Sequence, residues 1–167
     1  VIVTGTLTHT GLMTLDGSAA QTLTLAAARD GSLTLTGGAA RTVTLGAGLD
    51  MQGNTLTLTA ANDTLALAGN SLAFNSGTLS NTGTIQAQGN ETITFTGTAN
   101  DTDSGTWEYT GDGDGTSDAR TIKDFGATDY FNLIINDTNG TPANRDTFAA
   151  GAALTVAGDF TITDGAV

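Results

Sequence analysis

Short segments in which polar and apolar residues alternate recur along most of the chain. The stretch 53–74 contains three copies of one five-residue pattern: a polar or acidic residue, Thr or Ser, Leu, a small residue, and Leu or Phe. Related copies lie at 21–25, 31–35, 41–45 and 91–95. Strict alternation places successive side chains on opposite faces of a β-strand. Each segment therefore predicts a short strand with a buried Leu face and an outer Thr face.

The spacing of these segments predicts how the strands are arranged. Gly, Asn and Asp lie between the segments, and these residues tolerate positive φ and form tight corners. The segments of the first 75 residues begin 7 to 13 residues apart, which is too uneven for a propeller blade or a long helical repeat. We expect an all-β, right-handed parallel β-solenoid in which each coil takes two or three strands. Leu would then stack on Leu inside and Thr on Thr outside.

An antiparallel β-sandwich is the alternative, because it also has strands every 8–12 residues. A sandwich is expected to have larger aromatic residues in its core, whereas residues 1–90 contain a single aromatic residue, Phe74. The small aliphatic residues of this half suit the narrow core of a solenoid.

Composition changes near residue 97 and suggests three segments. Residues 1–97 are regular Thr/Leu/Gly coils, residues 98–129 are an acidic, Gly-rich insertion or irregular coils, and residues 130–167 are further solenoid coils. Eight of the nine aromatic residues lie at or beyond Phe95, so we expect larger core residues in the second half.

The charge of the chain limits its partners. The formal net charge is −12, with −2 in residues 1–90 and −10 in residues 91–167. So acidic a surface repels phosphate, which argues against binding to nucleic acid or to anionic membranes. No segment approaches the ~18 apolar residues of a membrane-spanning helix. The chain has no cysteine, which excludes disulfides and zinc–thiolate sites.

Three segments of the second half resemble a known kind of repeat. They are GTWEYTG at 105–111, YFNLII at 130–135 and GAALTVAGDFTITDG at 151–165. These segments resemble repeats of large bacterial surface proteins of the filamentous-haemagglutinin-like, parallel β-helix kind. The resemblance implies an extracellular stalk, adhesin or filament segment, and it brings no catalytic residues with it.

The acidic segment suggests a calcium site. Residues 110–121 overlay the alternating-oxygen calcium loop, with Asp112, Asp114 and Asp118 at the third, fifth and ninth positions. Thr110 and Thr121 stand where two further ligands would be expected. Asp101 and Asp103 are additional candidate ligands nearby in the sequence. The alternative is a solvated Asp-Gly turn without metal.

Two further features have both a functional and a structural interpretation. Trp107 and Tyr109 lie two residues apart on one strand face and could stack on a sugar ring, although such a pair more often belongs to a core. Repeated Thr-x-Thr pairs resemble the flat face of ice-binding solenoids, yet Thr is also an ordinary outer residue of strands. These pairs include Thr6/Thr8, Thr22/Thr24, Thr34/Thr36, Thr42/Thr44, Thr55/Thr57 and Thr92/Thr94.

Together these patterns favour a non-catalytic structural segment of an extracellular or cell-surface β-solenoid, such as a bacterial adhesin stalk or a filament subunit. Its expected partners are further copies in a homopolymer or the neighbouring repeats of a longer chain. The alternative is a surface module that binds carbohydrate or calcium, and a lesser alternative is an ice-binding Thr face.

Overall fold

The computed structural model describes residues 10–25, 31–37, 39–97 and 100–164. Within these residues the chain is all-β apart from one 3-10 turn, Pro142–Asn144. Every pairing between strands is parallel. The strands stack as a β-solenoid of about 5 turns, as the alternation of the sequence predicts. Because an antiparallel sandwich requires antiparallel neighbours, this alternative is excluded.

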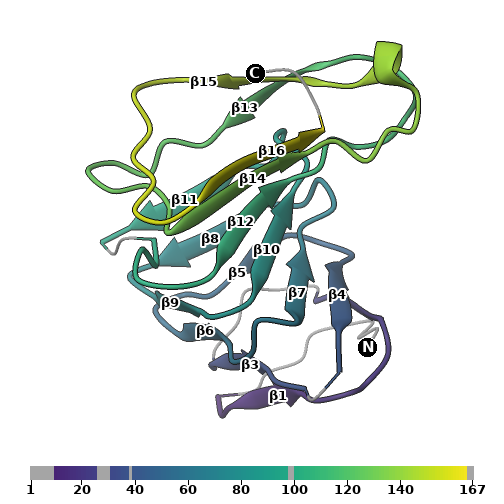
Figure 1. Cartoon of the computed structure of the whole chain (residues 1–167). Helices are drawn as coiled ribbons and strands as arrows, with labels where there is room; N and C mark the ends of the chain where they lie inside the picture. The colour runs from purple at the N-terminus through teal and green to yellow at the C-terminus, as the bar shows by residue number, and fades with distance from the viewer. Residues whose placement is uncertain (1–9, 26–30, 38, 98–99, 165–167) are drawn as a thin grey trace.

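Three faces run along the stack (Figure 1). The first face contains β1 (Met13–Leu15), β3 (Leu33–Leu35), β6 (Thr55–Leu58) and β9 (Thr78–Asn81). The second contains β2 (Gln21–Leu23), β4 (Arg41–Leu45), β7 (Asp63–Ala66), β10 (Thr84–Ala87), β12 (Thr106–Tyr109), β14 (Asn132–Asn136) and β16 (Phe160–Asp164). The third is divided into β5 (Leu49–Asp50), β8 (Leu72–Asn75) and β11 (Ile93–Thr96), and a separate pair, β13 (Ala119–Ile122) and β15 (Thr147–Ala150).

Inward residues form columns along the stack. Leu33, Leu56 and Leu79 occupy equivalent positions in successive coils and are all buried. The outward neighbours are also in register, with Thr34 beside Thr57 and Thr57 beside Ser80. Each fully buried Leu contributes about 1.5–3 kcal/mol from removal of its side chain from water. Stacking of like on like therefore stabilises the rod coil by coil, as expected from the alternating pattern.

The corners explain the Gly-Asn pairs between strands. Between β5 and β6 the backbone turns through Gln52 and Gly53, with φ of 43° and 80°. The Asn54 side-chain amide then donates to the carbonyl of Met51 at 2.9 Å. The side chain of Asn70 makes the equivalent bond to Leu67 O at 3.1 Å and also reaches Leu45 O of the preceding coil. Corner asparagines thus satisfy carbonyl groups that the turning backbone leaves without a ladder partner.

The core changes from aliphatic to aromatic along the stack. Phe74 and Phe95 stack with ring centroids 4.7 Å apart, and Phe125 meets Phe95 edge-on at 5.2 Å. The coils lengthen over the same part of the chain. Equivalent positions advance by 20 to 22 residues from Leu65 through Ile85 to Trp107, and by 26 to 27 from Trp107 through Leu133 to Phe160. Larger side chains fill the interior of these longer coils.

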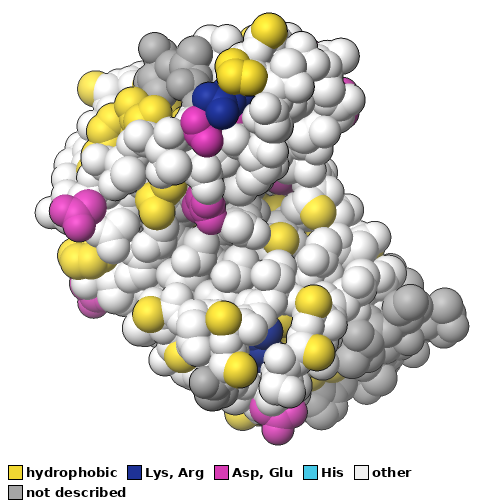
Figure 2. Space-filling view, turned by 45° about the vertical axis from the view of Figure 1, so that its right-hand side comes forward, with side chains coloured by type: hydrophobic (Ala, Val, Ile, Leu, Met, Phe, Trp, Pro, Cys, Tyr) yellow, Lys and Arg dark blue, Asp and Glu magenta, His cyan; other side chains and the backbone are white. Residues whose placement is uncertain are grey.

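The outer surface is mostly uncharged. Figure 2 shows a face on which basic side chains are few and separated from one another. In the described part of the chain, no helix is long and apolar enough to span a membrane.

Candidate functional site

The acidic loop between β12 and β13 lies against the loop between β14 and β15. The backbone joins the two loops at both ends, from Thr138 N to Thr110 O at 3.0 Å and from Thr147 N to Asp118 O at 2.8 Å. The Ser117 hydroxyl also donates to Arg145 O at 2.6 Å. Acidic residues far apart in the sequence therefore meet in space.

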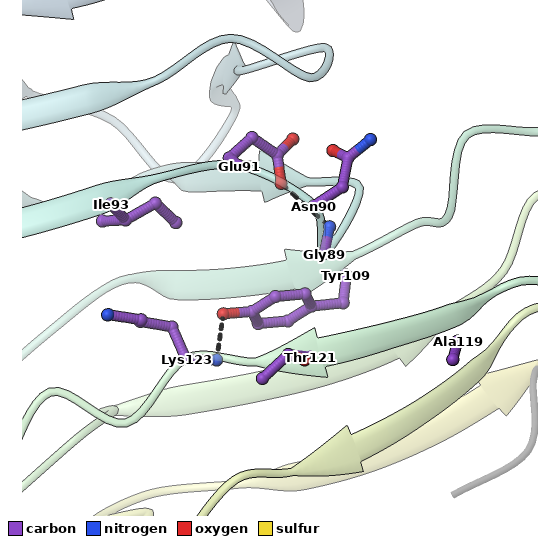
Figure 3. A pocket seen from close by; sticks show the side chains of 8 residues that line it. All are labelled: Gly89, Asn90, Glu91, Ile93, Tyr109, Ala119, Thr121 and Lys123. Atoms are coloured by element: carbon purple, nitrogen blue, oxygen red, sulfur yellow. Dashed lines mark hydrogen bonds between the residues drawn. The ribbon is translucent and has the colours of Figure 1, made fainter.

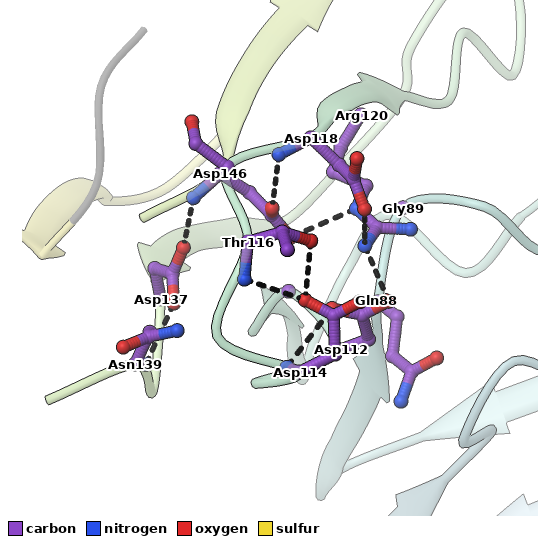
Figure 4. Close-up of polar contacts among 12 residues, drawn as sticks. Gln88, Gly89, Asp112, Asp114, Thr116, Asp118, Arg120, Asp137, Asn139 and Asp146 are labelled. Carbon is purple, nitrogen blue, oxygen red and sulfur yellow. Dashed lines mark hydrogen bonds and ion pairs between the residues drawn. The ribbon is translucent and has the colours of Figure 1, made fainter. Parts of the chain in front are cut away.

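Arg120 lies at the centre of this meeting point (Figure 4). Its guanidinium contacts carboxylate oxygens of Asp112 at 2.5 Å, Asp118 at 3.0 Å and Asp146 at 2.8 Å. The three carboxylates have oxygens within 4.8 Å of one another. Burial by itself lowers the pKa of Arg120, but the bonds to Asp112 and Asp146 outweigh this effect and raise the pKa. We call these four residues the Arg120 cluster.

Asp137 and Asp146 fix the second loop under the cluster. Asp146 Oδ1 accepts a hydrogen bond from Asp118 N at 2.8 Å, and the Asp146 amide donates to Asp137 Oδ2. The other oxygen of Asp137 accepts from Asn139 N at 2.7 Å. Gly111 has φ of 65°, and a Cβ there would come within 2.7 Å of Asp146 Oδ2. Only glycine fits here without a shift of the carboxylate.

The structure divides the five aspartates of the predicted calcium site. Asp112 and Asp118 converge in the Arg120 cluster. Asp114 instead closes its own turn, where it accepts bonds from Thr116 N at 2.8 Å and Thr116 Oγ1 at 2.7 Å; these bonds lower its pKa. Asp114 therefore lies outside the cluster.

Asp101 and Asp103 precede β12, whereas the Arg120 cluster follows it. Asp101 accepts from Asn81 N at 2.6 Å and from Asp103 N at 3.2 Å. Partial burial raises the pKa of Asp101 despite these bonds. Both residues line a hollow of about 390 Å³ with Ser80 and Thr102. The five aspartates thus form two separate groups rather than one ligand set.

The Arg120 cluster can do one thing well, which is to hold two loops together. Calcium requires six to eight oxygens around the ion, and here the guanidinium lies between the carboxylates that would supply them. Asp146 completes the cluster, and sequence reasoning missed it because it lies 26 residues from Arg120. The available signal was Arg120 itself, a single basic residue within an acidic segment.

Trp107 and Tyr109 are buried in the core, each about 1% exposed. Trp107 Nε1 donates to Asn100 Oδ1 at 3.2 Å. Tyr130 Oη donates to Lys123 O, so Tyr109 Oη supplies the hydrogen of its 2.9 Å bond to Tyr130. Tyr109 Oη in turn accepts from Lys123 N at 2.9 Å. The rings belong to the core and present no face on which a sugar could stack.

A hollow of about 410 Å³ lies beside this tyrosine network, between the 89–91 turn and β13 (Figure 3). Glu91 is its carboxylate, and the backbone amides of Gly69, Gln88 and Gly89 bind it at 3.1, 2.7 and 2.9 Å. Glu91 therefore holds the turn in place, and its oxygens are engaged by backbone donors.

The Thr surface is regular in one column only. Thr42, Thr64, Thr84 and Thr106 lie in register along the second face. The adjacent column begins with Thr22 and Thr44 but continues with Ala66, Gln86 and Glu108. A flat two-column Thr grid, which the ice-binding alternative requires, is thus interrupted on this face. Thr6 and Thr8 lie outside the described residues.

Fold and site together define a parallel β-solenoid protein whose long loops are joined by a buried arginine. Comparison of the chain with protein-family models, with curated proteins and with solved structures found no match. The fold therefore rests on the strand pairing itself, and the resemblance to filamentous-haemagglutinin-like repeats extends only as far as the shared solenoid architecture.

Proposed function

We propose that this chain is a non-catalytic structural segment of an extracellular or cell-surface β-solenoid, an adhesin stalk or filament subunit of the filamentous-haemagglutinin-like kind. One observation carries the proposal. Among the described residues, the large hydrophobic side chains that are exposed are Leu12, Phe160 and Ile162, and these belong to the first and last parts of the stack. The flanks between them are polar, as in a spacer.

The mechanism of such a spacer is mechanical. The second face is one continuous ladder of seven parallel strands. At about 4.8 Å per strand the ladder extends roughly 30 Å, and each coil adds a hydrogen-bonded, apolar interface with its neighbours. Inter-loop bonds such as those of the Arg120 cluster keep the longer coils in register. Stiffness along the stack follows from these repeated interfaces.

The carbohydrate- or calcium-binding alternative has less support. It depends on residues 100–130, where Arg120 occupies the centre of the carboxylates and Trp107 and Tyr109 are buried.

Surface location and inertness test the proposal together. Antibody raised against the chain should label intact source cells, and protease treatment of those cells should remove the label. Purified chain should show no turnover on a panel of acidic and neutral polysaccharides. A signal confined to the cell interior, or turnover above that of buffer, would overturn the proposal.

A further inference from the structure

The two ends of the solenoid differ. At the first end, the inward column that contains Val43 terminates in Gln21. Gln21 is polar, and Arg41 donates to its side-chain oxygen at 3.2 Å. At the other end the same column terminates in Phe160, beside Leu133. A column that ends in a bound polar residue is closed, whereas one that ends in Phe160 continues the core into solvent.

Phe160 and Ile162 are core residues in position and surface residues in exposure. They are in register with Leu133 and Ile135, which are fully buried, yet they are 51% and 49% exposed. An apolar hollow of about 230 Å³ lies beside them, lined by Ile122, Leu133, Ala150, Leu154, Val156 and Phe160. Exposed apolar surface next to an unfilled apolar hollow marks a site of association.

The backbone of β16 also has a free edge. Leu133 N donates to Asp159 O at 2.9 Å, so Asp159 and Thr161 direct their backbone groups towards β14. The backbone N–H and C=O groups of Phe160 and Ile162 therefore point to the opposite edge, away from β14. Strand edges of this kind pair with another strand when one is offered.

We propose that a second copy of this chain docks on this end, with β16 antiparallel to the β16 of the partner about a two-fold axis through Thr161. This register places Phe160 opposite Ile162 of the other copy, twice. It pairs the two outward-pointing backbone positions with each other, as hydrogen-bonded pairs of an antiparallel ladder require. Asp159 then lies opposite Thr163, so no two carboxylates face each other.

A two-fold contact follows from the difference between the ends. Head-to-tail stacking needs two complementary open ends and produces fibres, whereas a self-complementary patch closes at two copies. Here one end presents Phe160 and Ile162 and the other ends in the Gln21–Arg41 pair. The proposed dimer is a rod of twice the length, and it specifies the partner of the structural role proposed above, on which it rests.

The mass of the particle in solution tests the contact. By sedimentation velocity, the 16.7 kDa chain should associate to twice its mass and no further as its concentration rises. The double variant Phe160→Asp/Ile162→Asp should weaken the dimer by about 100-fold or more, as loss of a central apolar anchor does. Leu12→Asp, a change of an exposed apolar residue at the other end, is the matched control and should leave the dimer intact.

Position 161 tests the symmetry independently of the apolar residues. Because the chain has no cysteine, Thr161→Cys introduces a single thiol that should form a disulfide-linked dimer, whereas Leu12→Cys should not. Thr161→Asp and Thr161→Lys should each weaken the dimer alone and restore it when mixed, because the two positions lie opposite each other. This mixing experiment decides the question if the double aspartate variant fails to fold.

Several outcomes would overturn the inference. They are a wild-type chain that stays monomeric to about 1 mM, species larger than a dimer, loss of the dimer in Leu12→Asp, and no cross-link through position 161. The surface-location experiment stays informative in each case, because a monomeric chain can still serve as a stalk.

Discussion

Arg41 lies directly opposite Asp63 in the register of β4 and β7, and the two side chains form a fully buried ion pair with Arg41 Nε 3.2 Å from Asp63 Oδ1. The same guanidinium donates to Leu15 O and to Gln21 Oε1, and so spans three successive coils. Asp63 Oδ2 accepts from Ala60 N at 3.2 Å. A single charged pair thus ties the first coils together inside an otherwise apolar stack.

Removal of either partner should destabilise the protein strongly. Asp63→Ala should lower the free energy of unfolding by about 3–5 kcal/mol, because it leaves the buried Arg41 charge uncompensated. The combined variant Arg41→Met/Asp63→Leu should cost less than the sum of the single changes. Urea unfolding measures both, and Asp16→Ala, at an exposed position, should stay within about 0.5 kcal/mol of wild type. Additive single and double variants would show that the pair is not coupled.

The tyrosine pair should titrate late. Burial raises the pKa of Tyr109 to about 12, and burial and the neighbouring Tyr109 raise the pKa of Tyr130 further. Both values exceed the value of about 10 in an unfolded chain, so this contribution to stability is complete below pH 10 and declines as the pH rises towards 12. The chain has only these two tyrosines, so ultraviolet absorbance of tyrosinate reports them alone. Ionisation near pH 10 in the folded protein would contradict the buried network.

Loss of the Tyr130 hydroxyl should also be measurable. Tyr130→Phe removes the donor to Lys123 O and one partner of Tyr109. The expected loss is about 1–3 kcal/mol, because a buried carbonyl is left unpaired. Chemical denaturation measures it. A change below about 0.5 kcal/mol would mean that water replaces the hydroxyl.

Calcium should have little effect on the wild-type protein and a larger one once Arg120 is removed. In the wild type the guanidinium already neutralises the clustered carboxylates, so about 5 mM calcium should shift Tm by less than about 1 °C. Arg120→Ala leaves the oxygens of Asp112, Asp118 and Asp146 close together, and its lowered Tm should rise with calcium. Thermal melts with calcium or EDTA measure both. Arg145→Ala, which breaks an ion pair with Asp164, is the control and should show no response.

Two glycines of the same loop give a matched test of steric contact. Gly111 and Gly115 both have positive φ, at 65° and 91°. Alanine at either position should cost roughly 1–2 kcal/mol for the left-handed backbone. At Gly111 the new Cβ would also meet Asp146 Oδ2, whereas nothing lies within 4 Å at Gly115. Gly111→Ala should therefore lose about 1–3 kcal/mol more in urea unfolding; equal losses would exclude the contact.

Some features of the site were visible in the sequence. The acidic loop was identified as a special segment, and Asp112 and Asp118 do meet there. Asp146 could not be found by pattern, because its place beside Arg120 depends on the alignment of two loops in different coils. The buried position of Trp107 and Tyr109 agrees with the core interpretation of that pair, since a solenoid strand turns alternate residues inward.

The sequence alone determined the strands, their inward Leu and outward Thr faces, and their Gly-Asn corners, because alternation and turn preference are local properties of a few residues. Only the tertiary structure decided which strands lie side by side. Three strands make one coil, and the length of the coil decides that Leu33 meets Leu56 and that Arg41 meets Asp63. That length depends on how side chains of the whole coil fill the interior, which no short pattern specifies. The same packing decides that Phe160 and Ile162, which alternate like any core pair, are left at an open end.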